Sequence, residues 1–449
     1  MNVLYVVIDT LRADHLSCYG YKRKTSPNID RLAEEGVLFS RAYPSDVPTQ
    51  PSYTAMFTGK RGISTGVVSH SESETLSDSE IWYPQILAEK GYETAAVSTL
   101  YLMKKYIARG FKHYLDPMAG FPSFVQKVTA DQINQMAIPW LKQNYKKNFF
   151  LFIHYWDPHT VYLPPKRYRN LYYQGNPSAP DNHSLDGMKN TILYPFILRL
   201  LKEMGNNITD IEYVIAQYDA EITYADEKLG EVVQTLGELN ILDDTLIIVT
   251  ADHGESMGEH DIYFDHEGVY EPTAHVPLIF KHPSLPPGKK IDALVQLIDI
   301  APTIFEFLGL EVPQKFEGSS LLNLIQSKTD KHYDEIYINQ GLWQAVRAIR
   351  NERFKLLKFI DRPFSPGPMT ELYDLEKDPG ETKNLAEKEK DIADKLELKL
   401  RRWEEKKLGK KVDPLRVIAE RGLPSTKWIR DLIEKNKGSY EEWREKMGW

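Results

Sequence analysis

The sequence is poor in features that would place the protein in a membrane or outside a reducing compartment. Cys18 is the only cysteine among 449 residues, so the chain cannot form an internal disulfide. No stretch approaches the roughly 20 apolar residues that a membrane span needs. The apolar start of the chain lacks the basic segment and the cleavage site of a signal peptide. We therefore expect a cytoplasmic protein without a membrane anchor.

The sequence also lacks an excess of positive charge. It carries 64 Asp and Glu residues against 56 Lys and Arg residues, which gives a net charge of -8. Because sequence-independent binding to nucleic acids depends on clustered Lys and Arg side chains, this balance argues against a nucleic-acid partner. With 42% hydrophobic and 27% charged residues, the composition is that of a folded globular protein.

Short and almost continuously apolar segments recur along the chain. Residues 3–8, 149–156 and 244–250 have the pattern of parallel strands that helices cover on both faces. Residues 218–236 show the apolar spacing of a helix. This alternation predicts an α/β fold with a mostly parallel central sheet. Residues 163–210, which are rich in Tyr, Pro and Asn, are predicted as an insertion over the rim of that sheet.

The length of the chain exceeds that of one ordinary hydrophobic core. We therefore predict a large catalytic domain at residues 1–328 and a smaller C-terminal subdomain at 329–449. The predicted subdomain is α+β, with a small antiparallel sheet, a charge-rich helix and a helical tail. Its segments are 336–338, 344–349 and 354–359 for the strands and 387–408 for the helix.

Metal-ligand residues follow two of the predicted strands. Asp9 comes directly after the first strand, and Asp252 and His253 follow a later one. Thr49 stands two residues before Pro51, where a helix can begin, and the free N–H groups of a helix start can bind an anion. Because the carboxyl ends of parallel strands meet at one edge of a sheet, we expect these side chains to lie together. Their oxygen and imidazole donors suit Zn²⁺ or Mn²⁺, which would lower the pKa of the Thr49 hydroxyl.

Asp157, His159 and His266 form a second predicted set of ligands, for a second divalent ion. Two cations would clamp the attacking and leaving oxygens of an in-line displacement. Each motif alone is also common in turns and helix caps, so the prediction depends on their joint occurrence. The other histidines near these motifs are expected to be structural or exposed: His260, His275 and His282, with His154 as a hydrogen-bonded core residue.

Together these motifs resemble the sulfatase family of the alkaline-phosphatase superfamily, and the resemblance covers nearly the whole chain. It implies an alkaline-phosphatase-like sandwich, metal binding by Asp9, Asp252 and His253, and a nucleophile at position 49. The residues that carry the resemblance are 2–14, 18–20, 26–39, 157–159 with 164–165, 250–255, 266–277, 299–303 and 371–385.

The departures from the family pattern bear on the chemistry. Sulfatases carry a cysteine or serine that is oxidised to formylglycine, followed by a proline and an arginine, where this chain has Thr49 and Tyr53. The branched Cβ of threonine cannot yield that aldehyde. Thr10 replaces the second aspartate of the opening pair, which disfavours Ca²⁺ or Mg²⁺. His266 stands where the family has a catalytic lysine, and the Lys-x-His expected near 99–101 is missing.

These departures resemble the phosphodiesterase and phosphoethanolamine-transferase branches, which use threonine and two metal ions. We expect a metal-dependent hydrolase of small phosphate mono- or diesters that acts through a phosphothreonine at Thr49. His159 and His266 are the further catalytic residues of this prediction. The alternatives are hydrolysis of a sulfate ester, transfer of a phosphoryl group, and a non-catalytic metal-binding protein.

Overall fold

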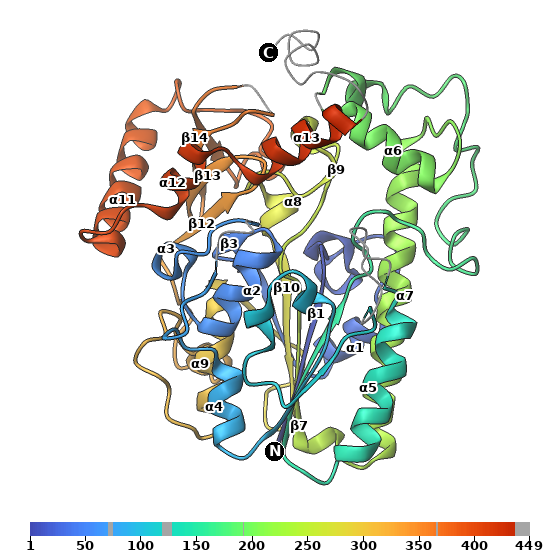
Figure 1. The fold of residues 1–449 in the computed structure, drawn as a ribbon, viewed down its shortest axis with the longest axis vertical. Coiled ribbons are helices and arrows are strands. Elements are labelled where there is room, and N and C mark those ends of the chain that lie inside the picture. Colours follow the sequence, from blue (N-terminus) through green and yellow to red (C-terminus); the bar gives the residue numbers. More distant parts are fainter. Residues whose placement is uncertain (71–74, 119–127, 192, 365–366, 436–449) are drawn as a thin grey trace.

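A twisted sheet with helices on both faces forms the centre of the larger part of the chain (Figure 1). The computed structural model describes residues 1–70, 75–118, 128–191, 193–364 and 367–435. Within these residues the sheet has eight strands. In their order across the sheet they are β11 (Lys289–Gln296), β2 (Val37–Tyr43), β10 (Val276–Lys281), β7 (Thr245–Thr250), β1 (Asn2–Ile8), β6 (Phe149–Tyr155), β4 (Glu93–Val97) and β5 (His113–Leu115).

The predicted parallel character of this sheet is confirmed. Every pair of neighbours is parallel except the two that involve β10, which runs antiparallel to β7 and to β2. All residues of the central strands β1, β6 and β7 are buried. Their continuous apolar sequences are therefore explained by the helices that cover both faces of the sheet.

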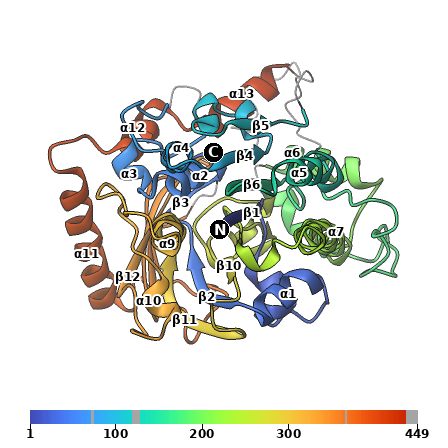
Figure 2. The ribbon, with the colours of Figure 1, turned by 90° about the horizontal axis from the view of Figure 1, so that it is seen from below.

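Two groups of helices cover the sheet, with α1, α5 and α7 on one face and α2, α4 and α9 on the other (Figure 2). None of the described helices is both long and apolar enough to cross a membrane. The helices of this part are α1 (Pro27–Glu34), α2 (Thr49–Thr58), α3 (Gly62–Thr65), α4 (Tyr83–Glu89), α5 (Ala130–Asn144), α6 (Tyr194–Met204), α7 (Ile211–Glu238), α8 (Glu271–Ala274), α9 (Ile300–Phe307) and α10 (Leu322–Ile325).

A second, smaller sheet belongs mainly to the C-terminal part. Its strands β12 to β15 pair antiparallel in sequence order, and the two-residue strand β3 pairs parallel with β12. Helix α11 packs against this sheet, and two shorter helices follow. Residues 436–449 of the predicted helical tail lie outside the described residues. The elements are β3 (Asp46–Val47), β12 (Glu335–Gly341), β13 (Ala345–Asn351), β14 (Phe354–Asp361), β15 (Thr370–Asp374), α11 (Lys390–Leu408), α12 (Pro414–Arg421) and α13 (Pro424–Lys435).

Strand β3 connects the smaller sheet to the start of α2. Asp46 lies in β3, and its carboxylate accepts hydrogen bonds of 2.8 Å from the side chain of Asn339 in β12 and from the backbone N–H of Gly62. Thr49 follows β3 after a single intervening residue and opens α2. The position of Thr49 therefore depends on residues of the C-terminal part.

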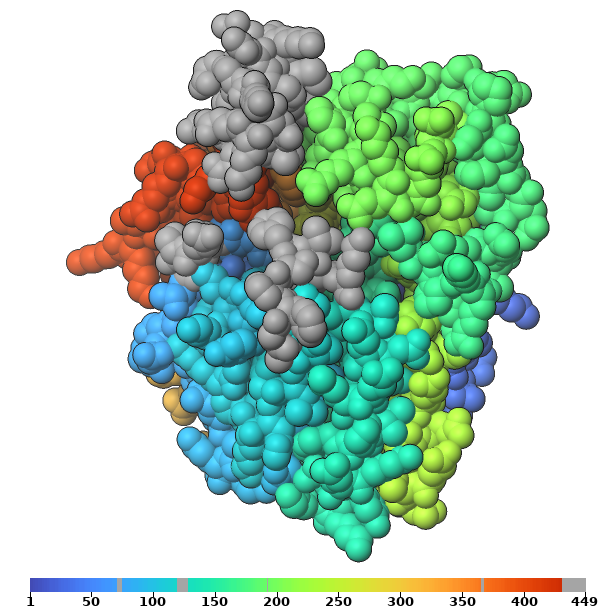
Figure 3. All heavy atoms as spheres, turned by 45° about the vertical axis from the view of Figure 1, so that its right-hand side comes forward, coloured from blue at the N-terminus to red at the C-terminus, as the bar shows by residue number. Residues whose placement is uncertain are grey.

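The carboxyl edge of the central sheet lies between two surface segments. Residues 163–210, green in Figures 1 and 3, rise on one side of this end of the molecule, and the C-terminal helices, red, lie on the other. The predicted insertion thus lies at the edge where the ligand-type residues follow the strands.

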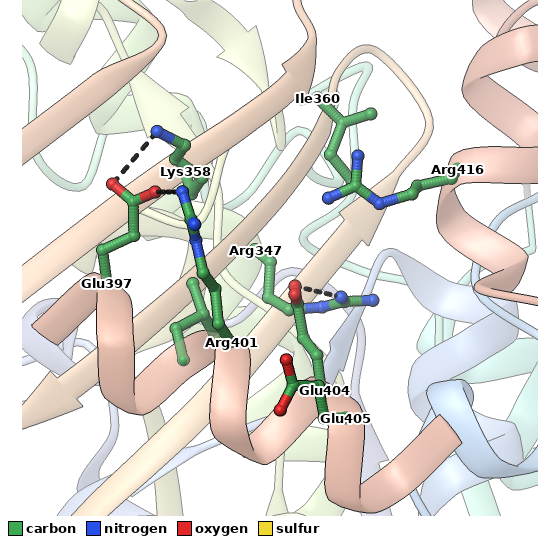
Figure 4. A pocket seen from close by; sticks show the side chains of 9 residues that line it. Arg347, Lys358, Ile360, Glu397, Arg401, Glu404, Glu405 and Arg416 are labelled. Atoms are coloured by element: carbon green, nitrogen blue, oxygen red, sulfur yellow. Dashed lines mark hydrogen bonds and ion pairs between the residues drawn. The ribbon is translucent and has the colours of Figure 1, made fainter. Parts of the chain in front are cut away.

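A charged pocket of about 330 Å³ lies between β13, β14 and α11 (Figure 4). Arg347, which is 1% exposed, donates from Nε to Asn339 at 2.6 Å. Its remaining N–H groups bind Asp413, at 3.1 Å, and Glu404. This guanidinium therefore connects the smaller sheet to α11 and to the start of α12.

We expect the substitution Arg347→Met to lower the free energy of unfolding by about 3 kcal/mol. It leaves the buried carboxylate of Asp413 with only the longer contact of 3.7 Å to Arg416, and the loss of one partner of a buried ion pair is costly. Equilibrium urea unfolding measures the change. Arg401→Met is the matched control in the same pocket, because Arg401 is 66% exposed and its removal is expected to cost at most about 0.5 kcal/mol. Equal effects of the two substitutions would contradict the role of Arg347.

Candidate active site

Three ligand-type side chains meet at the carboxyl ends of β1 and β7. Asp9 directly follows β1, and Asp252 and His253 follow β7. The parallel pairing of these two strands brings their ends side by side. One ligand atom of each residue lies within 4.8 Å of those of the other two, and all three residues are 0% exposed. The edge of the sheet therefore forms a buried cluster of two carboxylates and an imidazole.

Thr49 lies beside this cluster. Its Oγ1 is 3.1 Å from Nε2 of His253. Ser52, one turn further along α2, donates a hydrogen bond of 2.8 Å to the backbone oxygen of Asp252 and so ties the helix to the end of β7. The four residues that the sequence predicted as one group, Thr49 with Asp9, Asp252 and His253, are therefore brought together.

The cluster has the electrostatics of a cation site. Oδ1 of Asp9 and Oδ2 of Asp252 are buried without a hydrogen-bond partner among the described residues. Burial, followed by the charge of Asp9, raises the pKa of Asp252 to about 7, and burial also raises the pKa of Asp9. Because unpaired buried carboxylates are costly, a divalent ion would stabilise this arrangement. Carboxylate, hydroxyl and imidazole donors fit such an ion.

The environment of His253 favours the tautomer that can bind a metal. Its Nδ1 lies 2.9 Å from the backbone oxygen of Gly254 and donates a hydrogen bond to it. The lone pair is then on Nε2, the nitrogen that faces Thr49. Burial lowers the pKa of His253 to about 4, so the ring is neutral at pH 7. A neutral imidazole held through its other nitrogen is the usual form of a histidine ligand.

Two further histidines extend the site. The ring of His266 stacks on His253 with centroids 4.5 Å apart, and the ring of His159 lies 5.7 Å from His266. Nδ1 of His159 donates to the backbone oxygen of Thr160 at 3.0 Å, which leaves its Nε2 as an acceptor. Burial lowers the pKa of His159 to about 3 and that of His266 to about 4. Both rings are therefore neutral proton acceptors at pH 7.

Asp157 has other partners. Its Oδ2 accepts a hydrogen bond of 2.7 Å from the backbone N–H of Ala130 at the start of α5. It also faces Glu221 of α7, whose pKa is raised by burial and by the charge of Asp157. The acids beside Nδ1 of His266 are instead Asp265 and Glu255, at 3.4 and 3.9 Å. In the described part of the chain, the group of ligand atoms around His266 is formed with Glu255 and Asp265, and Asp157 and His159 are not members of it.

The structure adds neighbours that the sequence analysis did not include. Nε2 of His154 lies 3.1 Å from Oδ2 of Asp9, which confirms a hydrogen-bonded core histidine and places it against the cluster. The buried ring of Tyr53 packs against His154, with centroids 5.4 Å apart. Burial and then the charges of His266, His253 and His159 lower the pKa of His70, which therefore faces the site. His70 lies in a loop without periodicity, so no pattern in the sequence marks it.

The chain is similar to known proteins along most of its length. A family model described as Sulfatase matches residues 1–310, and one described as N-sulphoglucosamine sulphohydrolase, C-terminal, matches residues 258–406. The chain is 26% identical to the N-acetylglucosamine-6-O-sulfatase of Bacteroides thetaiotaomicron, in an alignment that covers 88% of this chain and 85% of that protein.

Solved structures show the same fold. A structure in complex with its substrate D-glucosamine-2-N,6-O-disulfate matches with a TM-score of 0.74 at 22% identity. The match covers 92% of this chain and 99% of the chain in that structure. The phosphonate monoester hydrolase of Agrobacterium radiobacter has a TM-score of 0.71 at 22% identity and covers 91% of this chain and 96% of its own. The alkaline-phosphatase-like architecture predicted from the sequence is thereby confirmed.

Proposed function

The chain belongs to the sulfatase family, and on that premise we propose that it hydrolyses sulfate or phosphate esters with the Thr49 hydroxyl as the nucleophile. The observation that supports this proposal is the 3.1 Å approach of Thr49 Oγ1 to Nε2 of His253, beside two buried carboxylate oxygens, Oδ1 of Asp9 and Oδ2 of Asp252, that lack a hydrogen-bond partner among the described residues. These four residues would hold a divalent ion. Such an ion, when bound, lowers the pKa of a hydroxyl and polarises an ester.

In the proposed first step, Oγ1 of Thr49 forms a bond to the sulfur or phosphorus atom, and the bond from that atom to the alcohol oxygen breaks. The neutral ring of His159 can accept the hydroxyl proton and return it to the leaving alkoxide. In the second step, water cleaves the ester on Thr49, and its proton returns to Oγ1. The exclusion of solvent from the buried cluster strengthens each of these electrostatic interactions.

Sulfate esters are the first substrate class of this proposal, in place of the phosphate esters that the sequence favoured. The change follows from the relatives, which are named N-acetylglucosamine-6-O-sulfatase, Delta 4,5-hexuronate-2-O-sulfatase and Iduronate 2-sulfatase. Phosphate esters are the second class. The observation that favours them is Thr49 itself, because threonine cannot be converted to the formylglycine of sulfatases.

We expect the purified chain to hydrolyse nitrophenyl esters in a metal-dependent way. Nitrophenyl sulfate, nitrophenyl phosphate and bis-nitrophenyl phosphate are compared before chelation with EDTA, after it, and after addition of Zn²⁺ or Mn²⁺. Chelation should abolish hydrolysis and the metal should restore it, because the proposed mechanism needs a cation bound by the carboxylates and the imidazole. The ester with the highest kcat/KM shows whether the preferred substrates are sulfate or phosphate esters.

Two outcomes contradict the proposal. Hydrolysis that is unchanged after complete removal of metal would exclude the proposed role of the cluster. The absence of turnover on every ester, with metal bound, would favour the non-catalytic alternative.

A further inference from the structure

A second group of ligand-type side chains lies next to the proposed nucleophile. Glu255 follows β7 by a short loop, and Asp265 ends strand β9 (Tyr263–Asp265), which pairs antiparallel with β8 (Ser256–Met257). This hairpin brings Glu255 to the neighbouring residues Asp265 and His266, which lie further along the sequence. One ligand atom of each lies within 4.8 Å of those of the other two.

This group is buried, and two of its polar atoms are not satisfied, whereas Oδ1 of Asp265 accepts a hydrogen bond of 2.6 Å from the backbone N–H of His266. Glu255 is 0% exposed, Asp265 is 6% exposed, and the side chain of His266 is 12% exposed. Oε1 of Glu255 and Nδ1 of His266 have no hydrogen-bond partner among the described residues. Oε2 of Glu255 receives only a long bond of 3.4 Å from Thr160. Two buried carboxylates therefore adjoin a neutral imidazole, without a hydrogen-bonded cation to balance them.

The nearby cation Arg12 does not fill this role. Its Nη1 donates at 3.0 Å to the backbone oxygen of Glu255 rather than to the carboxylate. Its remaining N–H groups are bound by the carboxylates of Asp14 and Glu259, at 2.8 to 2.9 Å. The charge on the Glu255 side chain is thus left for another partner, and the orphaned Oε1 atom points to a ligand that supplies positive charge.

We propose that Glu255, Asp265 and His266 bind a second divalent cation. Two carboxylates and one imidazole are a donor set for Zn²⁺ or Mn²⁺, and three protein ligands leave coordination positions open for water or substrate. Because the ring of His266 stacks on His253, this second site adjoins the site of Asp9, Asp252 and Thr49. The proposal concerns metal binding alone and does not require that the chain hydrolyse an ester.

The competing arrangement is an internal ion pair in which a protonated His266 balances the two acids. The two arrangements differ in the number of metal ions that the chain holds. We expect the full chain, stripped of metal, incubated with Zn²⁺ and desalted, to hold two ions per chain by inductively coupled plasma mass spectrometry. Glu255→Gln and Asp252→Asn should each hold one ion, and the double variant should hold none.

Titration with Zn²⁺ gives an independent measurement on the same proteins. Glu255→Gln should weaken the Kd of one site by at least about 100-fold and leave the other unchanged, because it replaces a ligand oxygen. Glu259→Gln is the matched control: Glu259 is four residues further along, and its carboxylate binds Arg12, so this variant should hold two ions. Asp265→Asn replaces Glu255→Gln if the latter lacks the circular dichroism spectrum of the wild type.

Two results would overturn the proposal. The first is a wild type that holds a single ion, lost in Asp252→Asn and kept in Glu255→Gln. The second is two ions in both Glu255→Gln and Asp265→Asn, with unchanged affinities. A chain that holds two ions in the predicted pattern but hydrolyses no ester would support the second cation and contradict only the proposed function.

Discussion

Replacement of Thr49 by alanine is expected to lower kcat/KM for the best ester substrate by at least about 1,000-fold. The substitution removes the only atom of this residue that can attack sulfur or phosphorus. Oγ1 of Thr49 lies 3.1 Å from Nε2 of His253, and Thr49 is 2% exposed at the start of α2. Steady-state hydrolysis of the nitrophenyl ester, with metal at saturation, measures the loss.

Two variants control this experiment. Thr49→Ser keeps a hydroxyl and should retain more activity than Thr49→Ala. Thr58→Ala removes a buried hydroxyl of the same helix that donates to the backbone oxygen of Thr54 at 2.6 Å, and its kcat/KM should change less than about threefold. Activity in Thr49→Ala within about tenfold of the wild type would exclude Thr49 as the nucleophile.

Asp252→Asn is expected to change hydrolysis and stability in opposite directions. Loss of one carboxylate ligand should lower kcat/KM at least about 1,000-fold and weaken metal binding. In the metal-free chain, however, the same substitution removes the repulsion between Asp252 and Asp9 and should stabilise the fold by on the order of 2 kcal/mol at pH 8. With a saturating divalent ion the order reverses, because the ion stabilises the wild type more strongly.

The stabilisation of the metal-free variant should depend on pH. Burial and Asp9 raise the pKa of Asp252 from about 4 when unfolded to about 7 when folded. The folded metal-free wild type therefore binds more protons than the unfolded chain between these values and loses stability as the pH rises through them. The difference from Asp252→Asn should be small near pH 4 and largest above pH 7.

Urea unfolding in EDTA at pH 5 and pH 8 measures this difference. Asp244→Asn, at an exposed position just before β7, is the control and should change stability by less than about 0.5 kcal/mol at both pH values. A metal-free Asp252→Asn protein that is less stable than the wild type at pH 8 would contradict a repulsive apo site.

The central strands could be predicted from the sequence because burial on both faces leaves a continuous apolar signature. β1, β6 and β7 carry that signature, and their ends located Asp9, Asp252 and His253. β2 and β11 were missed. Ser40 and Arg41 interrupt the apolar residues of β2, and β11, at the edge of the sheet, begins with Lys289 and Lys290. Partly exposed strands keep polar residues, so their pattern does not stand out.

The direction of a side chain at the end of a strand was harder to predict than its position. Asp157 follows β6 as expected, but its carboxylate satisfies the first N–H group of α5, a helix that the sequence analysis did not identify. Glu255 and Asp265 were visible only as members of an acidic and histidine-rich segment. Their approach depends on the β8–β9 hairpin, whose two short strands carry too few residues to show a period.

The pairing of β3 with β12 has a consequence for the order in which the protein can mature. Asp46 is held by Asn339, which lies 293 residues later in the chain. A growing polypeptide that has emerged only as far as α10 can assemble every strand of the central sheet, but it lacks the partner that fixes the approach to α2. Helix α2 can then be held by the bond of Ser52 to the end of β7, but Thr49, the proposed nucleophile, gains its second support only after the C-terminal strands have been synthesised.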